Sequence, residues 1–155
     1  MAKRIDVMSI AAVIGTLYPP PFDEPCRSRE RRKLGDQAGL TQFGVNLLRL
    51  VPGAWSSQRH WHTEEDELVF MLEGEVVLVE DDGDYVLRPG DCAAWKAGVA
   101  NGHCLQNRSG ADAVYLEIGS RRPQTDACDY PDIDMVARPA EPFYRHRDGT
   151  PYPQD

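Results

Sequence analysis

The stretch His60-Trp61-His62-Thr63-Glu64-Glu65-Asp66-Glu67 organises this chain, and Gly74 follows its last residue after six intervening positions. Side chains alternate between the two faces of a strand, so both histidines would project from the same side of an extended segment. A turn within the stretch would bring Glu67 back beside them. Imidazole and carboxylate groups that meet inside a sheet suit a divalent transition metal.

Length and composition limit the class of protein. The 155 residues are enough for one domain with a sizeable core. Hydrophobic residues make up 41% and charged residues 27% of the chain, a balance that argues against wholesale disorder. The formal charge of -8 disfavours nucleic acid and anionic membranes as partners. No run approaches the roughly 18 apolar residues of a membrane helix. We expect a soluble acidic protein with neither partner.

The cysteines point to a reducing compartment. Four are present, widely scattered and without paired zinc spacing: Cys26, Cys92, Cys104 and Cys128. Free thiols and a cytoplasmic location are therefore expected. Residues 7–15 superficially resemble a secretion signal, but the stretch is short, and Asp6 and Ser9 interrupt the apolar pattern.

From residue 41 onward, short runs of β-forming residues alternate with Gly, Pro, Asn and Asp. The expected strands cover 43–51, 58–62, 68–72, 75–80, 84–87, 92–95, 102–106 and 114–118. Their regular spacing, without long helical periodicity, predicts an all-β sandwich or barrel over residues 41–120.

The two flanking regions have a different character. Residues 1–40 are expected to form an irregular N-terminal arm, in which the prolines of 18–22 enforce an extended chain. Residues 27–33 carry five basic side chains. A solvated helix or loop face and an anion-binding or subunit-contacting arm both remain open for them. Residues 121–155 combine turn formers with aromatic side chains and are expected to be an ordered extension packed on the barrel.

Two motifs in the barrel region resemble those of the cupins. The first reads Gly53, six residues, His60-x-His62, four residues, Glu67, six residues, Gly74. The second reads Gly90-x5-Lys96-x-Gly98-x4-His103-x3-Asn107. The resemblance covers about residues 43–118. It implies a jelly-roll β-barrel of six to eight strands, usually paired as a homodimer, and it does not imply a substrate. We expect the partner to be a small-molecule ligand or substrate.

The chain departs from the cupin pattern at three points. One extra residue separates Gly53 from His60, Lys96 stands where proline is usual, and His103 comes two residues late. The late histidine follows a loop rich in Gly and Asn, where extra residues cost little.

The resemblance implies one divalent transition metal held by His60, His62, Glu67 and His103. Glu67 is preferred over its acidic neighbours because it has the motif spacing to Gly74, and it shares strand parity with Val69 and Met71. Three imidazoles and one carboxylate leave one or two positions open for water, substrate or dioxygen. These donors suit Zn, Fe, Mn, Ni or Co and do not choose among them.

Three residues are candidates to support the metal site or its chemistry: Gln58, Tyr115 and Glu117. Gln58 shares the strand parity of the histidine pair, and the other two share one face of the last core strand, either inward or outward. An isomerase or lyase would need an acid or base near the metal, with Tyr115 or Glu117 as the first candidates. A dioxygenase would need redox-active iron and a dry cavity. A noncatalytic protein that binds a carbohydrate or carboxylate and a purely structural dimer are the alternatives.

Overall fold

The computed structural model describes residues 4–153. Its strands are β1 (Val13–Ile14), β2 (Glu30–Lys33), β3 (Phe43–Leu50), β4 (Trp61–His62), β5 (Glu67–Glu73), β6 (Val76–Glu80), β7 (Gly83–Leu87), β8 (Cys92–Trp95), β9 (Cys104–Gln106), β10 (Ala113–Ser120), β11 (Cys128–Tyr130), β12 (Met135–Ala137) and β13 (Tyr144–Arg145). The helices are α1 (Leu34–Ala38) and two 3-10 turns, Val7–Ser9 and Glu24–Cys26.

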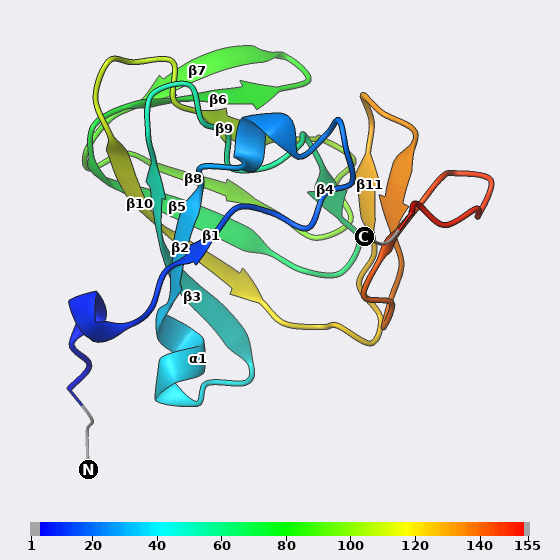
Figure 1. Ribbon diagram of the computed structural model, residues 1–155, viewed down its shortest axis with the longest axis horizontal. Helices are drawn as coiled ribbons and strands as arrows, with labels where there is room; N and C mark the ends of the chain where they lie inside the picture. Colours follow the sequence, from blue (N-terminus) through cyan, green and yellow to red (C-terminus); the bar gives the residue numbers. More distant parts are fainter. Residues whose placement is uncertain (1–3, 154–155) are drawn as a thin grey trace.

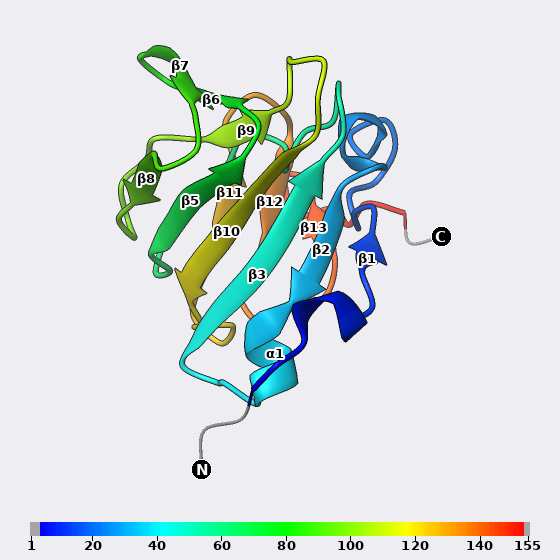
Figure 2. The same cartoon turned by 90° about the vertical axis from the view of Figure 1, so that its left-hand side faces the viewer.

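The strands form three antiparallel sheets. The largest has the order β1-β2-β3-β10-β5-β8, the second the order β13-β12-β11-β4, and the third the order β7-β6-β9. Figure 2 shows the large sheet in front with β11 and β12 behind it, and Figure 1 shows the β6–β7 hairpin at one end. The expected all-β jelly-roll barrel is confirmed.

The strands expected over residues 41–120 correspond to β3–β10, with one correction. Residues 58–59 are not part of a strand, because β4 covers only Trp61–His62 and His60 forms an isolated bridge with His103. The parity argument that placed Gln58 on the histidine face therefore loses its basis, since alternation holds only inside a regular strand.

The N-terminal region contributes two strands to the large sheet. β2 pairs with β3, and β1 pairs with β2. A helix or loop face is therefore wrong for Glu30–Lys33, because these residues form a strand between β1 and β3 of the large sheet. No helix in residues 4–153 is long and apolar enough to span a membrane.

The inward face of the large sheet carries the main core. Leu48, Leu50, Met71 and Tyr115 have no exposed surface, and Val69 is buried beside them. A second buried cluster joins the N-terminal region to the tail. In it, Tyr18 and Cys26 pack with Tyr130 and Met135. The tail is thus anchored to the barrel by both this cluster and the β4–β11 pairing.

Gly74 holds the turn after β5. Its φ of +68° lies in the left-handed region, and a Cβ at this position would collide with the carbonyl oxygen of Asp112. Glycine is therefore required where the motif places it.

Candidate metal centre

The first and second motifs meet through backbone pairing. The His60 amide donates to the His103 carbonyl at 3.1 Å, and the His103 amide donates to the His60 carbonyl at 2.9 Å. The two extra residues before His103 lie in the loop between β8 and β9 and leave this pairing intact. The late histidine therefore still lies opposite the first motif.

Three imidazoles converge on one carboxylate oxygen. The Oε2 atom of Glu67 lies 2.9 Å from Nε2 of His103, 3.4 Å from Nε2 of His62 and 4.0 Å from Nε2 of His60. The side chain of Glu67 is 18% exposed and those of the histidines are at most 15% exposed. The structure thus brings together all four residues that the motif spacing selected as candidate ligands.

The opposite ring nitrogens of two histidines have partners of their own. Nδ1 of His60 lies 2.9 Å from the Gln58 carbonyl oxygen, and Nδ1 of His62 lies 2.7 Å from Oδ2 of Asp126. When these rings are neutral, an Nδ1–H donor in each contact leaves the Nε2 lone pair directed toward Glu67, which is the tautomer that a metal requires. Nδ1 of His103 is buried and has no hydrogen-bond partner within residues 4–153.

Aromatic rings fix the planes of two imidazoles. Trp95 stacks on His103 with centroids 3.8 Å apart and an interplanar angle of 6°. Tyr130 stacks on His60 with centroids 5.4 Å apart. These contacts restrict ring rotation, so the donor atoms are held in place before any ion binds.

The pKa values of His60, His62 and Glu67 depend on one another. Burial lowers the pKa of His60 to about 4, which keeps its ring neutral. Burial alone would raise the pKa of Glu67, but the hydrogen bond from His103 and the nearby imidazoles lower it to about 2. Burial likewise opposes charge on His62, yet Asp126, Cys128 and Glu67 raise its pKa to about 11. The proton on His62 thus balances the negative charge of Glu67, and a bound divalent ion would take over that role.

The donor set fits one divalent ion. Three imidazole nitrogens and one carboxylate oxygen satisfy the ligand chemistry of Zn, Fe, Mn, Ni or Co. The ring of His60 is already held neutral, with its Nδ1 beside the Gln58 carbonyl oxygen. His60, His62 and Glu67 also have donor atoms mutually within 4.8 Å. The sequence motif and the geometry therefore agree on the same place.

The tail supplies two groups that the motifs do not contain. Asp126 binds His62, and Sγ of Cys128 lies 3.3 Å from Nδ1 of the same ring. Asp126 also accepts hydrogen bonds from the amides of Glu64 and Glu65, at 2.8 and 3.2 Å. No local pattern could have identified Asp126, because it lies 64 residues after His62 and reaches it only through the pairing of β11 with β4.

The three supporting candidates have different positions. The Gln58 side chain turns away and donates to the Phe22 carbonyl at 2.7 Å, so only its backbone oxygen contacts the site. Tyr115 is fully buried, and its hydroxyl has no hydrogen-bond partner within the described chain. Glu117 accepts a hydrogen bond from Asn46 at 2.8 Å. Tyr115 and Glu117 both line a small cavity of about 20 Å³ beside His60 and His103, so both face inward.

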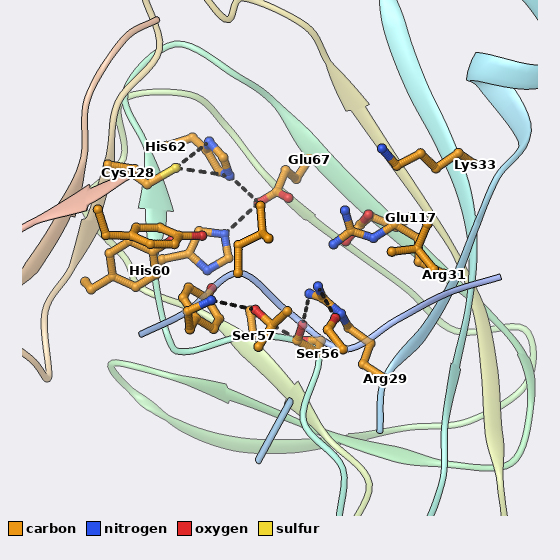
Figure 3. Close-up of a pocket in the computed structure, with 18 of the residues that line it drawn as sticks. Arg29, Arg31, Lys33, Ser56, Ser57, His60, His62, Glu67, Glu117 and Cys128 are labelled. Carbon is orange, nitrogen blue, oxygen red and sulfur yellow. Dashed lines mark hydrogen bonds and ion pairs between the residues drawn. The ribbon is translucent and has the colours of Figure 1, made fainter. Parts of the chain in front are cut away.

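A larger cavity of about 490 Å³ opens over the same site. His60, His62, Glu67 and Glu117 contribute to its wall. The facing wall carries Arg29, Arg31 and Lys33. Figure 3 shows the three basic side chains on one side of the cavity and His60, His62 and Cys128 on the other. The volume falls in the range of small-molecule binding sites.

Comparison with known proteins finds a matching family and a relative that is similar over nearly the whole chain. Residues 46–119 match the model of the Cupin domain family. A cupin-superfamily sugar phosphate isomerase from Silicibacter pomeroyi is 45% identical, with 99% of this chain and 98% of that chain covered and a TM-score of 0.91. Among curated proteins, none matches this sequence.

Two further structures are more distant. A proposed sugar phosphate isomerase from Acidithiobacillus ferrooxidans is 30% identical, with 81% and 74% of the two chains covered and a TM-score of 0.67. The polyketide cyclase RemF from Streptomyces resistomycificus is 21% identical, with 89% and 85% covered and a TM-score of 0.63, and shares the fold alone. On the family match and the full-length relative from Silicibacter, this chain belongs to the cupin superfamily.

Proposed function

We propose that this cupin is a metal-dependent isomerase that acts on a small phosphorylated sugar. The observation that carries the proposal is the convergence of three Nε2 atoms on Glu67 in a cavity that also holds Glu117. His60, His62, Glu67 and His103 would hold the ion. The name of the Silicibacter relative, 45% identical over its full length, supports the choice of reaction and of substrate class.

The cavity favours an isomerase over a dioxygenase. An isomerase needs a protein base beside the metal, and Glu117 is a partly buried carboxylate on the cavity wall. Its Oε2 accepts a hydrogen bond from Asn46, whereas Oε1 has no partner within residues 4–153 and is free to accept a proton. The three basic and two acidic side chains on the wall also suit a charged substrate better than the dry cavity that oxygen chemistry needs.

In this proposal Glu117 is the base that moves the proton between carbon atoms, and Tyr115 is a hydrogen-bond donor. A bound divalent ion would supply Lewis-acid polarisation of the substrate oxygens. Glu117 removes the proton from the carbon beside the carbonyl and returns it to the former carbonyl carbon, while the hydroxyl proton moves to the former carbonyl oxygen. Burial, with the adjacent charge of Glu117, raises the pKa of Tyr115, so its hydroxyl stays protonated and acts as a hydrogen-bond donor.

The test is isomerisation of aldose and ketose phosphates in D₂O, followed by NMR, with protein whose metal content has been measured. Interconversion with deuterium entering at the carbon beside the carbonyl is expected. Glu117→Gln should lower kcat about a hundredfold or more at unchanged metal content. Glu75→Gln, which changes an exposed glutamate paired with Arg88, is the matched control and should behave as wild type. Oxygen consumption with these substrates, or full activity of Glu117→Gln, would contradict the proposal.

We also propose that the protein pairs as a homodimer through the outward face of the large sheet. Apolar side chains on this face are well exposed: Phe43 (43%), Phe70 (38%) and Leu72 (41%). The pairing of β10 with β3 and β5 extends this apolar face, because it places Leu116 between Leu47 and Phe70. An exposed apolar patch of this kind suits a subunit interface. Sedimentation equilibrium should give a dimer that Phe70→Glu converts to a monomer; a wild-type monomer would overturn the idea.

A cytoplasmic location is likewise a proposal. All four cysteines are free, and such thiols suit a reducing compartment. Fractionation of cells of the source organism would test it, and recovery of the protein outside the cytoplasm would contradict it.

A further inference from the structure

The basic wall of the cavity is made by alternate residues of one strand. Arg31 and Lys33 lie in β2, opposite Leu48 and Asn46 of β3, whose side chains face the barrel interior. Arg29 precedes the strand with the same alternation and also lines the cavity. In a protein with a formal charge of -8, this places three positive charges on a single inward surface.

Arg31 lacks the partner that every comparable arginine has. The other half-buried arginines within residues 4–153 bind a carboxylate or a carbonyl oxygen: Arg29, Arg32, Arg49, Arg59, Arg121 and Arg145. Among residues 4–153, the Arg31 side chain forms neither a hydrogen bond nor an ion pair, and its Nε is buried without an acceptor. A buried guanidinium nitrogen without an acceptor is unfavourable, so a ligand anion is the natural partner of Arg31.

Arg29 and Lys33, which flank Arg31 on the cavity wall, keep most of their positive charge available for an anion. Arg29 is held in place by the carbonyl oxygens of Ser56 and Gly15, at 2.6 and 2.9 Å, so no carboxylate neutralises its charge. Lys33 has only a distant ion pair with Asp36, at 3.8 Å, and Asp36 is bound more closely by Arg121. The positive charge of this wall therefore remains available.

We propose that Arg31 and Lys33 bind the phosphate group of the substrate, with Arg29 adding fixed positive charge; the assignment rests on the proposed function for the identity of the ligand. Planar guanidinium groups match phosphate oxygens in a bidentate contact. The three basic side chains lie on one side of the cavity and His60 and His62 on the other (Figure 3), so the phosphate and the ion would occupy opposite walls.

The sheet order sets the direction in which the substrate binds. Strands follow one another in the order β2-β3-β10-β5, so β2 lies about 14 Å from β5 at about 4.8 Å per strand. Glu117 on β10 stands one strand from Glu67 on β5 and two from Lys33 on β2. The substrate thus presents its carbonyl end to the metal and Glu117, and its phosphate to β2. Sugars phosphorylated at the carbon remote from the carbonyl satisfy this order, and sugar 1-phosphates do not.

Titration of the metal-loaded protein with inorganic phosphate, by calorimetry at constant ionic strength, tests the subsite without any assumption about the reaction. Arg31→Gln should weaken phosphate binding about tenfold, and Arg31→Lys should weaken it less. Arg32→Gln removes the adjacent positive charge, which points to the other face of the sheet, and should bind phosphate as wild type does. Lys33→Gln, at an exposed position, gives a second reading should Arg31→Gln fail to fold.

The outcomes separate the subsite from the reaction. Loss of phosphate binding in Arg31→Gln, even where no sugar phosphate is isomerised, supports the subsite and overturns only the reaction. Phosphate binding that is unchanged in both Arg31→Gln and Lys33→Gln overturns the subsite. Binding that disappears when the metal is chelated, and that neither substitution alters, also overturns it, because the phosphate would then be a metal ligand.

Discussion

The two ends of the barrel interior are built from the same strands and carry opposite chemistry. Along the inward face of β5, Glu67 is followed by Val69 and Met71. On β10, Glu117 is followed in the reverse direction by Tyr115 and Ala113. Each strand thus changes from charged to apolar within two to four residues. One end is filled for stability, and the other keeps charged groups around a cavity.

The two ends contribute differently to the stability of the fold. Met71 and its apolar neighbours lose water on folding and stabilise the barrel. The charged end instead holds Glu67 with a side chain only 18% exposed among three imidazoles, an arrangement that requires a compensating charge. Substitutions at the charged end should therefore change ligand binding, and substitutions at the apolar end should change stability.

His62→Ala should have the largest effect of those considered, because it removes one nitrogen donor and the group that Asp126 positions. We expect metal affinity to fall more than about a hundredfold, while the metal-free protein still folds. Isothermal titration with the metal measures the first quantity and circular dichroism the second. His146→Ala is the control, because His146 lies in the tail and binds Asp134 at 2.9 Å. Equal losses in both variants would contradict the site.

Met71→Ala tests the apolar end. Met71 has no exposed surface, so its truncation should lower the free energy of unfolding by about 2 to 5 kcal/mol. The folded variant should still bind one metal ion per chain. Val86→Ala, on β7 outside the large sheet and 44% exposed, should change the free energy of unfolding by less than about 1 kcal/mol. Denaturant unfolding would show the opposite order if the inward face did not carry the core.

Asp126→Asn should have the smallest effect, since the amide oxygen can still accept from Nδ1 of His62. The lost negative charge should weaken metal binding about tenfold. Asp129→Asn alters a carboxylate of the same tail that pairs with Arg147 at the surface, and should leave metal affinity unchanged. A metal titration in which Asp126→Asn matched wild type would show that the tail does not support the centre.

The sequence was informative wherever local spacing controls the outcome. Strand alternation and the spacing between Glu67 and Gly74 led to the residues that the structure brings together around Glu67. The fold followed from turn residues and regular strand lengths. The prediction that the Gln58 side chain shares the face of the two histidines was wrong, because Gln58 precedes strand β4 and strand alternation does not apply to it.

The remaining features depend on contacts between distant parts of the chain. Asp126 reaches His62 only because β11 pairs with β4, and spacing along the chain carries no sign of that pairing. The basic wall did leave a signal, since Arg29, Arg31 and Lys33 alternate as residues on one face of a strand do. That alternation acquires meaning only once β2 is known to lie beside β3.

The most direct test of the metal centre is anomalous diffraction from crystals of the metal-loaded protein, recorded at the absorption edge of the metal that elemental analysis identifies. We predict one peak, about 2.0 to 2.2 Å from Nε2 of His60, His62 and His103 and from the Glu67 carboxylate. A second set of donors within 4.8 Å of one another, His62, Asp126 and Cys128, lies beside this site. A peak at that second set, or no peak next to Glu67 in fully loaded crystals, would contradict the centre described above.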